Sequence, residues 1–315
     1  MLVSIVIPAY NAERFAAETV QSALAQTVAE REIIVIDDGS TDGTAGILRR
    51  FGDAIRCEFG PNCGASAARN RGTALSRGRY LQYLDADDLL EPDATAKRIS
   101  ALEESGADVA YSDWQRIQEQ ADGSFAPGDV VARSLNRIHA DPEISTFSSF
   151  WAPPAALLYS RNIVEKIGAW NESLPVIQDA RFLQDAALAG ARFVHVPGVG
   201  ARYRVHHGRR LSTHDFSASA RDIFRNTCDI QAIWERRGPL TAPQKAALSA
   251  SYDFVCRQTF AIDAQEFSRS LDALYRVRPG FQTSWPKIAG AARMVLGHAG
   301  AGMLMRMFGR PPPQA

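Results

Sequence analysis

Short apolar runs, each followed by a polar loop and then by a helical pattern, constrain the fold of this chain more than any other feature. The runs lie at residues 2–7, 32–36 and 81–84, and the first two are rich in β-branched residues; residues 56–59 are expected to form a further short strand. Segments between them space their apolar side chains as amphipathic helices do, at residues 12–26, 45–51 and 64–77. This β-loop-α alternation predicts an α/β fold with a mostly parallel sheet and right-handed crossovers. Pro8 is expected to end the first strand.

Three carboxylates follow the last of these runs within four residues. Asp85, Asp87 and Asp88 stand at the C-terminal end of a buried strand, and that edge of an open α/β sheet is where ligands bind. Carboxylates packed together repel one another unless a cation or a ligand's donors balance them. Hard oxygen ligands at this position suit Mg²⁺ or Mn²⁺ bound together with substrate phosphates. A solvated acidic turn that caps the next helix is the structural alternative.

Composition narrows the class of protein. A chain of 315 residues with 46% hydrophobic residues predicts one large domain or one domain with an appendage. The net charge is zero, so no bulk field favours nucleic acid and no nucleic-acid partner is expected. The four cysteines form no CxxC pair, which predicts reduced thiols in a cytoplasmic protein. Strand-like sequence from Leu2 leaves no room for a signal peptide, and the apolar runs are too short for a spanning helix.

The loop after the first run excludes the common nucleotide-binding motifs. A dinucleotide fold needs G-x-G-x-x-G at this point, where the chain has Pro8, Ala9 and Tyr10 instead. The sequence has no GxxxxGK[ST] motif either. A nucleotide base would therefore be held in another way, with Tyr10 flanking it and the Asp38 carboxylate accepting a base N–H. The structural alternatives are an aromatic residue that covers the sheet edge and a turn that caps a helix.

Four short segments carry a recognisable pattern. They are residues 3–11 (VSIVIPAYN), 34–42 (IVIDDGSTD), 62–64 with 68–72 (NCG and ARNRG) and 85–88 (DADD). In this order and spacing they resemble glycosyltransferase family 2, over roughly the first two-thirds of the chain. The resemblance implies a GT-A fold, a divalent metal (Mn²⁺ or Mg²⁺), a nucleotide-sugar donor and an inverting transfer.

The resemblance also assigns roles to single residues around the donor. Those implied to bind the nucleotide are Pro8, Ala9 and Tyr10 at the base, Asp38 as the acceptor of a base N–H, Arg69 and Asn70 on the bordering helix, and Asp85 facing the ribose or a metal-bound water. Asp87, the second acid of the D-x-D motif, is implied to bind the metal at the diphosphate. Asp88 is additional to the motif and is expected to support the metal ligand from behind.

A later segment, residues 169–182, resembles the family's G-x-F-D-E stretch and the E-D pair that follows it at a helix N-terminus. The pair here is Gln178-Asp179, so the first acid is missing while Asp179 keeps the position of the family's catalytic base. Inversion at the anomeric carbon is a one-step displacement that needs a base for the acceptor hydroxyl and a cation for the departing diphosphate. The structural alternative for Asp179 is helix capping, with Arg181 as a salt-bridge partner.

Residues 202–212 resemble the family's Y-R-x-H segment, which folds over the donor. His206 is implied to contact the metal or the diphosphate, and Arg204, Arg209 and Arg210 are expected to neutralise phosphate. The aromatic and proline-rich segment at residues 150–154 is expected to be a packed loop in preference to the wall of a sugar site.

The chain is expected to divide into three parts. Residues 1–214 form the GT-A catalytic domain, with a nucleotide-binding half (1–100) and an acceptor half (101–214), and residues 215–280 form a helical appendage. The tail at residues 281–315 is predicted to be amphipathic and basic. It fits two interpretations, a peripheral contact with an anionic membrane or packing within the protein or a homo-oligomer.

Together these features predict an inverting glycosyltransferase. It would move a sugar from a nucleoside diphosphate, with UDP favoured by the resemblance, to a hydroxyl of a glycan or lipid-linked acceptor in cell-surface polysaccharide synthesis at the cytoplasmic membrane face. One alternative is a nucleotidyltransferase, although the Gly-rich, Lys-bearing loop expected of it after the first strand is absent. The other is a degenerate sugar-nucleotide-binding or scaffolding subunit without turnover, for which Gln178 is the local hint.

Overall fold

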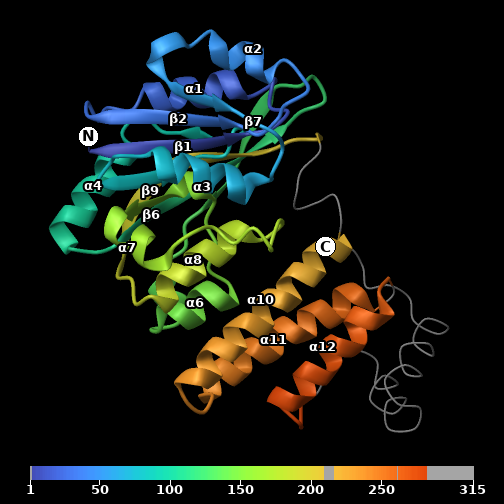
Figure 1. The fold of residues 1–315 in the computed structure, drawn as a ribbon. Coiled ribbons are helices and arrows are strands. Elements are labelled where there is room, and N and C mark those ends of the chain that lie inside the picture. Colours follow the sequence, from blue (N-terminus) through green and yellow to red (C-terminus); the bar gives the residue numbers. More distant parts are fainter. Residues whose placement is uncertain (1, 209–215, 261, 282–315) are drawn as a thin grey trace. The chain divides into compact units, whose positions relative to one another are not determined.

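In the computed structural model, the chain divides into two units, residues 1–208 and residues 209–315. The structure describes residues 2–208, 216–260 and 262–281. Helices flank a sheet in the first unit, and the described part of the second unit is helical (Figure 1). Each unit is described by itself below.

The N-terminal part of the sheet contains four parallel strands in the order β3-β2-β1-β4. They are β1 (Val3–Ala9), β2 (Arg31–Asp37), β3 (Arg56–Phe59) and β4 (Tyr80–Tyr83). All four lie where strands were predicted from the sequence. The central strands β1 and β2 are almost entirely buried, because a parallel sheet is covered by helices on both faces.

The three predicted helices between these strands are confirmed. They are α1 (Ala16–Leu24), α2 (Thr44–Arg49) and α3 (Ala65–Leu75). Alternate residues of β2 pack in different hydrophobic clusters: Ile33 and Val35 join the cluster that contains residues of α1 and α2, whereas Ile34 and Ile36 pack with Ala68 of α3. Successive side chains of a strand point to opposite faces, so helices cover both sides of β2.

The first strand does not end at Pro8 as predicted. Pro8 pairs in register with Ile36, and β1 continues to Ala9. The Val6 carbonyl accepts a hydrogen bond from Leu84 N, on the side of β1 that faces β4. The backbone nitrogen of Pro8, two residues later in the strand, points to the same side. Pairing of β1 with β4 ends at Val6, so a backbone N–H at position 8 would have no partner in β4. Proline, which lacks this N–H, therefore costs the sheet no hydrogen bond.

The rest of the sheet is mixed, in the order β4-β8-β6-β9-β5, with β7 paired to β6. The strands are β5 (Leu89–Leu90), β6 (Val109–Glu119), β7 (Phe125–Val131), β8 (Leu157–Ser160) and β9 (Phe193–Val205). β6 and β9 are parallel, whereas β8 runs antiparallel to β4 and β6, and β5 runs antiparallel to β9. β6 and β7 form an antiparallel hairpin.

Further helices follow in the chain and pack on this mixed part of the sheet or on one another. They are α4 (Ala94–Ser105), α5 (Leu135–Ile138), α6 (Pro142–Ser148), α7 (Arg161–Ile167) and α8 (Gln178–Leu188). β9 is the longest strand of the mixed part of the sheet, and its C-terminal end leads to His206.

The described part of the second unit contains the three helices α10 (Phe216–Arg237), α11 (Ala242–Thr259) and α12 (Ala264–Val277). They lie where a helical appendage was predicted, and they bury large side chains such as Trp234, Tyr252 and Phe267. The predicted boundary after residue 214, Arg209, Arg210 and almost all of the predicted tail fall outside the described residues. Among the described helices, none has the length and apolar character to span a bilayer.

Candidate active site

The acidic turn lies directly after β4, as predicted. Asp88 N donates to the Asp85 carbonyl at 3.0 Å and closes the turn. The Asp87 side chain points outward and is 37% exposed, whereas Asp88 is 1% exposed. The two acids therefore differ in access: Asp87 is available to a ligand, and Asp88 is part of the support.

Asp88 is held from behind by strand β9. Its Oδ1 accepts a hydrogen bond from the Arg204 backbone N–H at 2.9 Å. Burial raises the pKa of the Asp88 carboxyl well above its usual range, and the neighbouring charges of Asp87 and Asp85 add to the rise. Asp88 lies behind the exposed Asp87, and its support of a metal ligand there stays a prediction.

His206 lies beside Asp87. The Nε2 atom of His206 is 3.2 Å from Oδ2 of Asp87, and its ring packs on Phe15 with centroids 4.9 Å apart. The segment that was expected to fold toward the acids thus brings an imidazole to the exposed carboxylate. An imidazole nitrogen and a carboxylate oxygen are both ligands that a divalent transition metal accepts.

Arg204 does not have the role that the sequence suggested. Its side chain is only 3% exposed; the guanidinium donates to the Asp87 carbonyl at 2.9 Å and pairs with Glu18 of α1. It also lies over the rings of Phe15 and Phe125. The arginine was expected to neutralise phosphate, but it is used inside the protein, where it fastens the acidic turn to α1 and β9.

Asp85, the first acid of the turn, contacts Arg69 of α3. The two side chains form an ion pair, and the Arg69 guanidinium lies 4.5 Å from the ring centroid of Trp170. Burial raises the pKa of Asp85, Arg69 opposes that rise, and the charges of Asp87 and Asp179 add to it. Asp179, nearly a hundred residues away in sequence, therefore lies close enough to act electrostatically on the acidic turn.

Asp179 is in the first turn of α8, where a negative charge is favoured by the helix dipole. Its Oδ2 accepts a hydrogen bond from the Trp151 indole at 2.8 Å, and Oδ1 accepts one from Ala180 N at 2.8 Å. The N-cap of α8 is Ile177, which makes no side-chain cap, and Arg181 pairs with Asp185 at 2.8 Å. The alternative of a capping aspartate paired with Arg181 is therefore not what the geometry shows.

The residues predicted at the nucleotide base gather at the ends of β1 and β2. Pro8 and Ala9 are the last residues of β1, and Tyr10 follows them with 51% of its surface exposed. Asp38 is buried, and its two oxygens accept backbone N–H bonds from Cys63 (2.9 Å) and Gly64 (2.8 Å). Asp38 therefore shapes the loop before α3. Each of its oxygens keeps a second lone pair, and its predicted contact with a base stays a prediction.

Asn70 is engaged within the protein. Its amide donates to the Trp170 carbonyl (3.1 Å) and to Glu172 (2.8 Å), and its Oδ1 accepts from Trp170 N at 2.8 Å. Asn70 thus joins α3 to the segment that leads into α8. Contact with a nucleotide at this position stays a prediction.

Comparison with known proteins decides the family. A family model described as "Glycosyl transferase family 2" matches residues 4–168, which is more than half of the chain. The chain belongs to glycosyltransferase family 2. The match contains the acidic turn, Asp38, Arg69 and Trp151, while Asp179 and His206 lie beyond it.

Relatives of this family 2 chain show both the likeness and its extent. An uncharacterized glycosyltransferase of Rickettsia conorii is 30% identical over 184 residues, which is 56% of this chain and 30% of the relative. Chondroitin synthase of Escherichia coli is 46% identical over 96 residues, 30% of this chain and 14% of the relative. This family 2 chain therefore spans well under two-thirds of the length of these curated relatives.

A solved structure of another glycosyltransferase shows the same fold. The crystal structure of S. aureus TarS 1-349 in complex with UDP-GlcNAc superposes with a TM-score of 0.71 at 17% sequence identity, and the match covers 97% of this chain and 90% of that TarS chain. Together with the family match, this likeness confirms the GT-A α/β fold predicted from the resemblance.

A metal site in this family 2 chain would be built from few protein ligands. No group of three His, Cys, Asp or Glu side chains within the described residues is arranged to hold a metal ion. The Asp87–His206 pair is nevertheless compatible with one, because Mg²⁺ and Mn²⁺ at phosphate sites take only one or two protein carboxylates and complete their shell with substrate oxygens and water.

Three residues of the site were missed by sequence reasoning. Glu18, which pairs with Arg204, gave no signal in the sequence. Trp151 and Trp170 lie in segments that were noted, but the packed-loop expectation for residues 150–154 missed the indole N–H directed at Asp179. Trp151 precedes Pro153 by two residues and Pro154 by three. An aromatic residue so close to two prolines was the signal that could have pointed to a rigidly held indole N–H.

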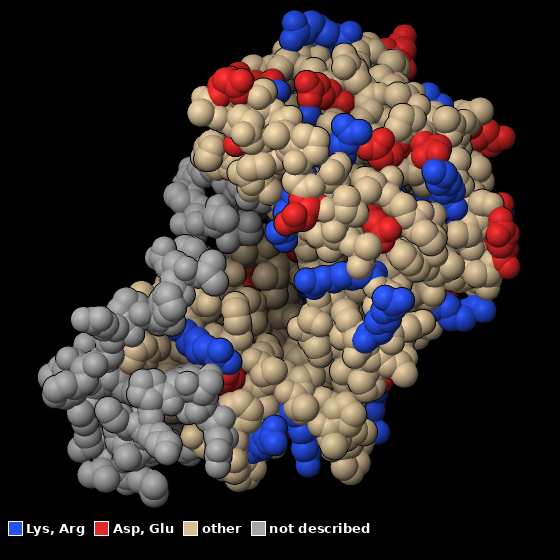
Figure 2. Space-filling model, turned by 180° about the vertical axis from the view of Figure 1, so that it is seen from behind, with Lys and Arg blue, Asp and Glu red and all other residues tan. Residues whose placement is uncertain are grey.

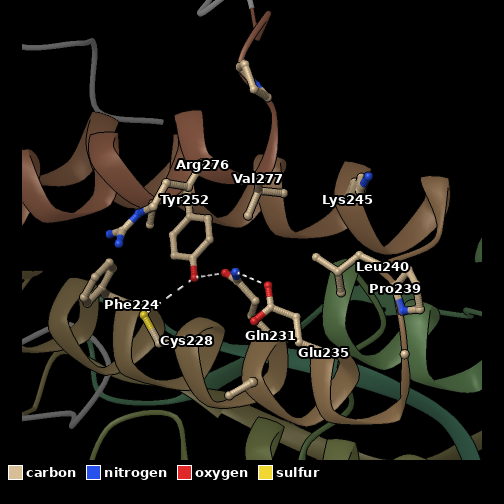
Figure 3. Close-up of a pocket in the computed structure, with 14 residues that line it drawn as sticks. Phe224, Cys228, Gln231, Glu235, Pro239, Leu240, Lys245, Tyr252, Arg276 and Val277 are labelled. Atoms are coloured by element: carbon tan, nitrogen blue, oxygen red, sulfur yellow. Dashed lines mark hydrogen bonds between the residues drawn. The ribbon is translucent and has the colours of Figure 1, made fainter.

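A cavity of about 990 Å³ lies within the helical unit (Figure 3). On one side the Tyr252 hydroxyl donates to Gln231 (2.7 Å), whose amide donates to Glu235 (2.7 Å). The cavity is lined by residues of α10, α11 and α12 and the segments that follow α10 and α12. All of the lining residues belong to this unit.

Proposed function

We propose that this family 2 protein is an inverting glycosyltransferase that transfers a sugar from a nucleoside diphosphate to an acceptor hydroxyl. The observation that carries the proposal is the geometry at the acidic turn: the Asp87 carboxylate is exposed and lies 3.2 Å from Nε2 of His206, and Asp179, held by two N–H donors, is close enough to add to the rise in the pKa of Asp85. One-step inversion needs a base for the acceptor hydroxyl and a group that balances the charge of the diphosphate, both close to the same bound donor. In this proposal Asp179 is the base, and Asp87 with His206 holds the cation that balances the charge.

In this proposal, Asp179 takes the proton from the acceptor hydroxyl. The carboxylate is partly buried and its two oxygens are oriented by two N–H donors, so it is preorganised for that step. Asp87 and His206 would hold Mn²⁺ or Mg²⁺, whose positive charge balances the negative charge of the departing diphosphate. Arg69 keeps Asp85 in place on the donor side.

The donor is proposed to bind along the C-terminal ends of β1, β2 and β4. Its base would lie near Pro8, Ala9, Tyr10 and Asp38, and its ribose near Asp85. A UDP-sugar is favoured because the TarS structure with the same fold holds UDP-GlcNAc. The likeness to chondroitin synthase supports a glycan acceptor in polysaccharide synthesis. A cytoplasmic location, a membrane contact through the tail and a homo-oligomer stay predictions.

Calorimetric titration with UDP, GDP and dTDP, each with and without Mn²⁺, tests the donor site first. We expect one nucleotide to bind only when Mn²⁺ is present, and the variant Asp87→Ala to lose that binding. If no nucleotide binds wild-type protein in the presence of Mn²⁺, the transferase proposal is wrong and the acids form a structural turn.

A second measurement separates an enzyme from a binding subunit. Wild-type protein incubated with the matching nucleotide sugar and a panel of glycan acceptors should release the nucleoside diphosphate. Metal-dependent binding without turnover in any pairing, unchanged by Asp179→Asn, would instead support a sugar-nucleotide-binding subunit.

A further inference from the structure

Trp151 lies against the proposed base. Its indole Nε1–H donates to Oδ2 of Asp179 at 2.8 Å, while Oδ1 accepts from Ala180 N at 2.8 Å. One of the two donors belongs to α8 itself, and the other comes from a separate part of the chain. We propose that Trp151 is the positioning residue of the base: it fixes the carboxylate plane of Asp179 toward the acceptor hydroxyl, an inference that rests on the proposed function.

The indole is itself held in place by two other aromatic rings. Trp151 packs edge-to-face on Trp114 (centroids 5.4 Å apart, 89° between planes) and on Tyr203 (5.7 Å, 84°). Trp114 and Tyr203 pack on each other at 5.5 Å. Edge-to-face contacts of this kind are favourable and directional, so the three rings restrict the rotation of the indole.

The backbone around Trp151 is restricted as well. Phe150 is buried and packs edge-to-face on Tyr111 of β6 with centroids 4.9 Å apart. Pro153 and Pro154 follow, and the 3-10 helix Pro154–Ala156 begins there. Because proline fixes φ near −65°, the donor atom is held by rigid structure on both sides.

These contacts connect the base to the sheet that carries the acids. Trp114 belongs to β6 and Tyr203 to β9, which are adjacent parallel strands. Tyr203 precedes His206 by three residues, and His206 lies beside Asp87. The distance between the base and the acidic turn is therefore set by the sheet through Trp151, rather than by α8 alone.

The test compares Trp151→Phe with Trp114→Phe. Both variants replace an indole of the same ring cluster by a benzyl group, but only the first removes the N–H that Asp179 accepts. For Trp151→Phe we expect kcat to fall roughly ten- to hundredfold, since misplacing a catalytic group by about 1 Å costs rate on this scale. The KM for the donor should change little, because the base is not a donor-binding group.

The pH profile of kcat separates positioning from packing. The donated indole N–H favours the charged, proton-accepting form of the carboxylate, so the acidic limb of the profile should move to higher pH in Trp151→Phe and stay in place in Trp114→Phe. An identical acidic limb and an equal loss of kcat in the two variants would overturn the inference.

A spectroscopic measurement on the full chain needs no turnover. With ¹⁵N-labelled tryptophan, the indole N–H resonance of Trp151, assigned by its loss in Trp151→Phe, should shift in Asp179→Ala, which removes the oxygen that accepts this N–H. A resonance that Asp179→Ala leaves unmoved would show that the hydrogen bond is absent. An inactive wild type would reject the proposed function, whereas an active wild type with an unaltered Trp151→Phe would reject the positioning role alone.

Discussion

Asp179 is the residue whose chemistry is most easily isolated by substitution. Asn has the same shape, and its carbonyl oxygen still accepts the indole N–H of Trp151, but it does not take up a proton. We expect Asp179→Asn to lower kcat by about 10²- to 10⁴-fold, the range of general-base effects. Metal-dependent nucleotide binding should be unchanged by calorimetry. Retention of kcat within a few-fold of wild type would contradict the assignment of the base.

Glu266 of α12 gives the helical unit a pH dependence. Burial raises the pKa of its carboxyl above the ordinary value of 4.5, so the native state binds this proton more tightly than the unfolded chain. Stability should therefore fall as pH rises from about 4.5 through the native pKa. In Glu266→Gln this fall should be absent, which urea unfolding followed by helical circular dichroism between pH 4 and 7 would measure. Equal slopes in both proteins would show that Glu266 does not control it.

At the scale of elements, the contact between α3 and β1 depends on one glycine. A Cβ at Gly72 would lie 2.3 Å from Cγ1 of Val6, whereas a Cβ at Gly46 of α2 would meet nothing within 4 Å. We expect Gly72→Ala to destabilise the protein by about 1–3 kcal/mol through overpacking. Gly46→Ala should instead stabilise it by up to about 1 kcal/mol.

Chemical denaturation of the two alanine variants beside wild type measures this difference. The substitution is the same and both glycines lie in helices, so helix propensity alone predicts the same direction for both. A stabilised Gly72→Ala protein would mean that α3 can move away from β1 at little cost, and that the close contact does not fix the helix.

Two elements from different parts of the chain hold the acidic turn. The Thr19 hydroxyl of α1 donates to the carbonyls of Ala86 and Asp88, both at 2.9 Å. From β9, the Arg204 side chain donates to the Asp87 carbonyl and its backbone N–H to Asp88. The turn is therefore rigid on its inner side, and the Asp87 carboxylate projects from it toward the ligand side.

At the scale of the whole molecule, the chain has 35 basic and 35 acidic residues and no net charge. On the face in Figure 2, acidic and basic side chains are interspersed. Because nucleic-acid affinity depends on a positive surface that neutralises phosphates and releases the counterions condensed on them, we expect no binding to duplex DNA at about 100 mM salt. Fluorescence anisotropy with labelled DNA measures this, with a basic DNA-binding protein as the positive control. Salt-sensitive binding would contradict the expectation.

The sequence alone determined the N-terminal half of the fold and the location of the acids. β1 to β4 and α1 to α3 were predicted because their apolar patterns are local and strongly periodic, and the acids at residues 85–88 followed from the end of a strand. Family segments in register then pointed to the GT-A fold and to Asp179. Each of these signals is contained within a short stretch of the chain.

The tertiary structure decided what depends on contacts between distant segments. The hydrogen bond from Trp151 to Asp179 and the ion pair of Arg204 with Glu18 join residues that are 28 and 186 positions apart in the sequence. The antiparallel strand β8 lies between β4 and β6 in the sheet, which differs from the order of these strands in the chain. Such contacts form only when the chain has folded, so no local pattern records them. For the same reason Arg204 looked like a phosphate ligand in the sequence, and only its burial showed that its charge is used inside the protein.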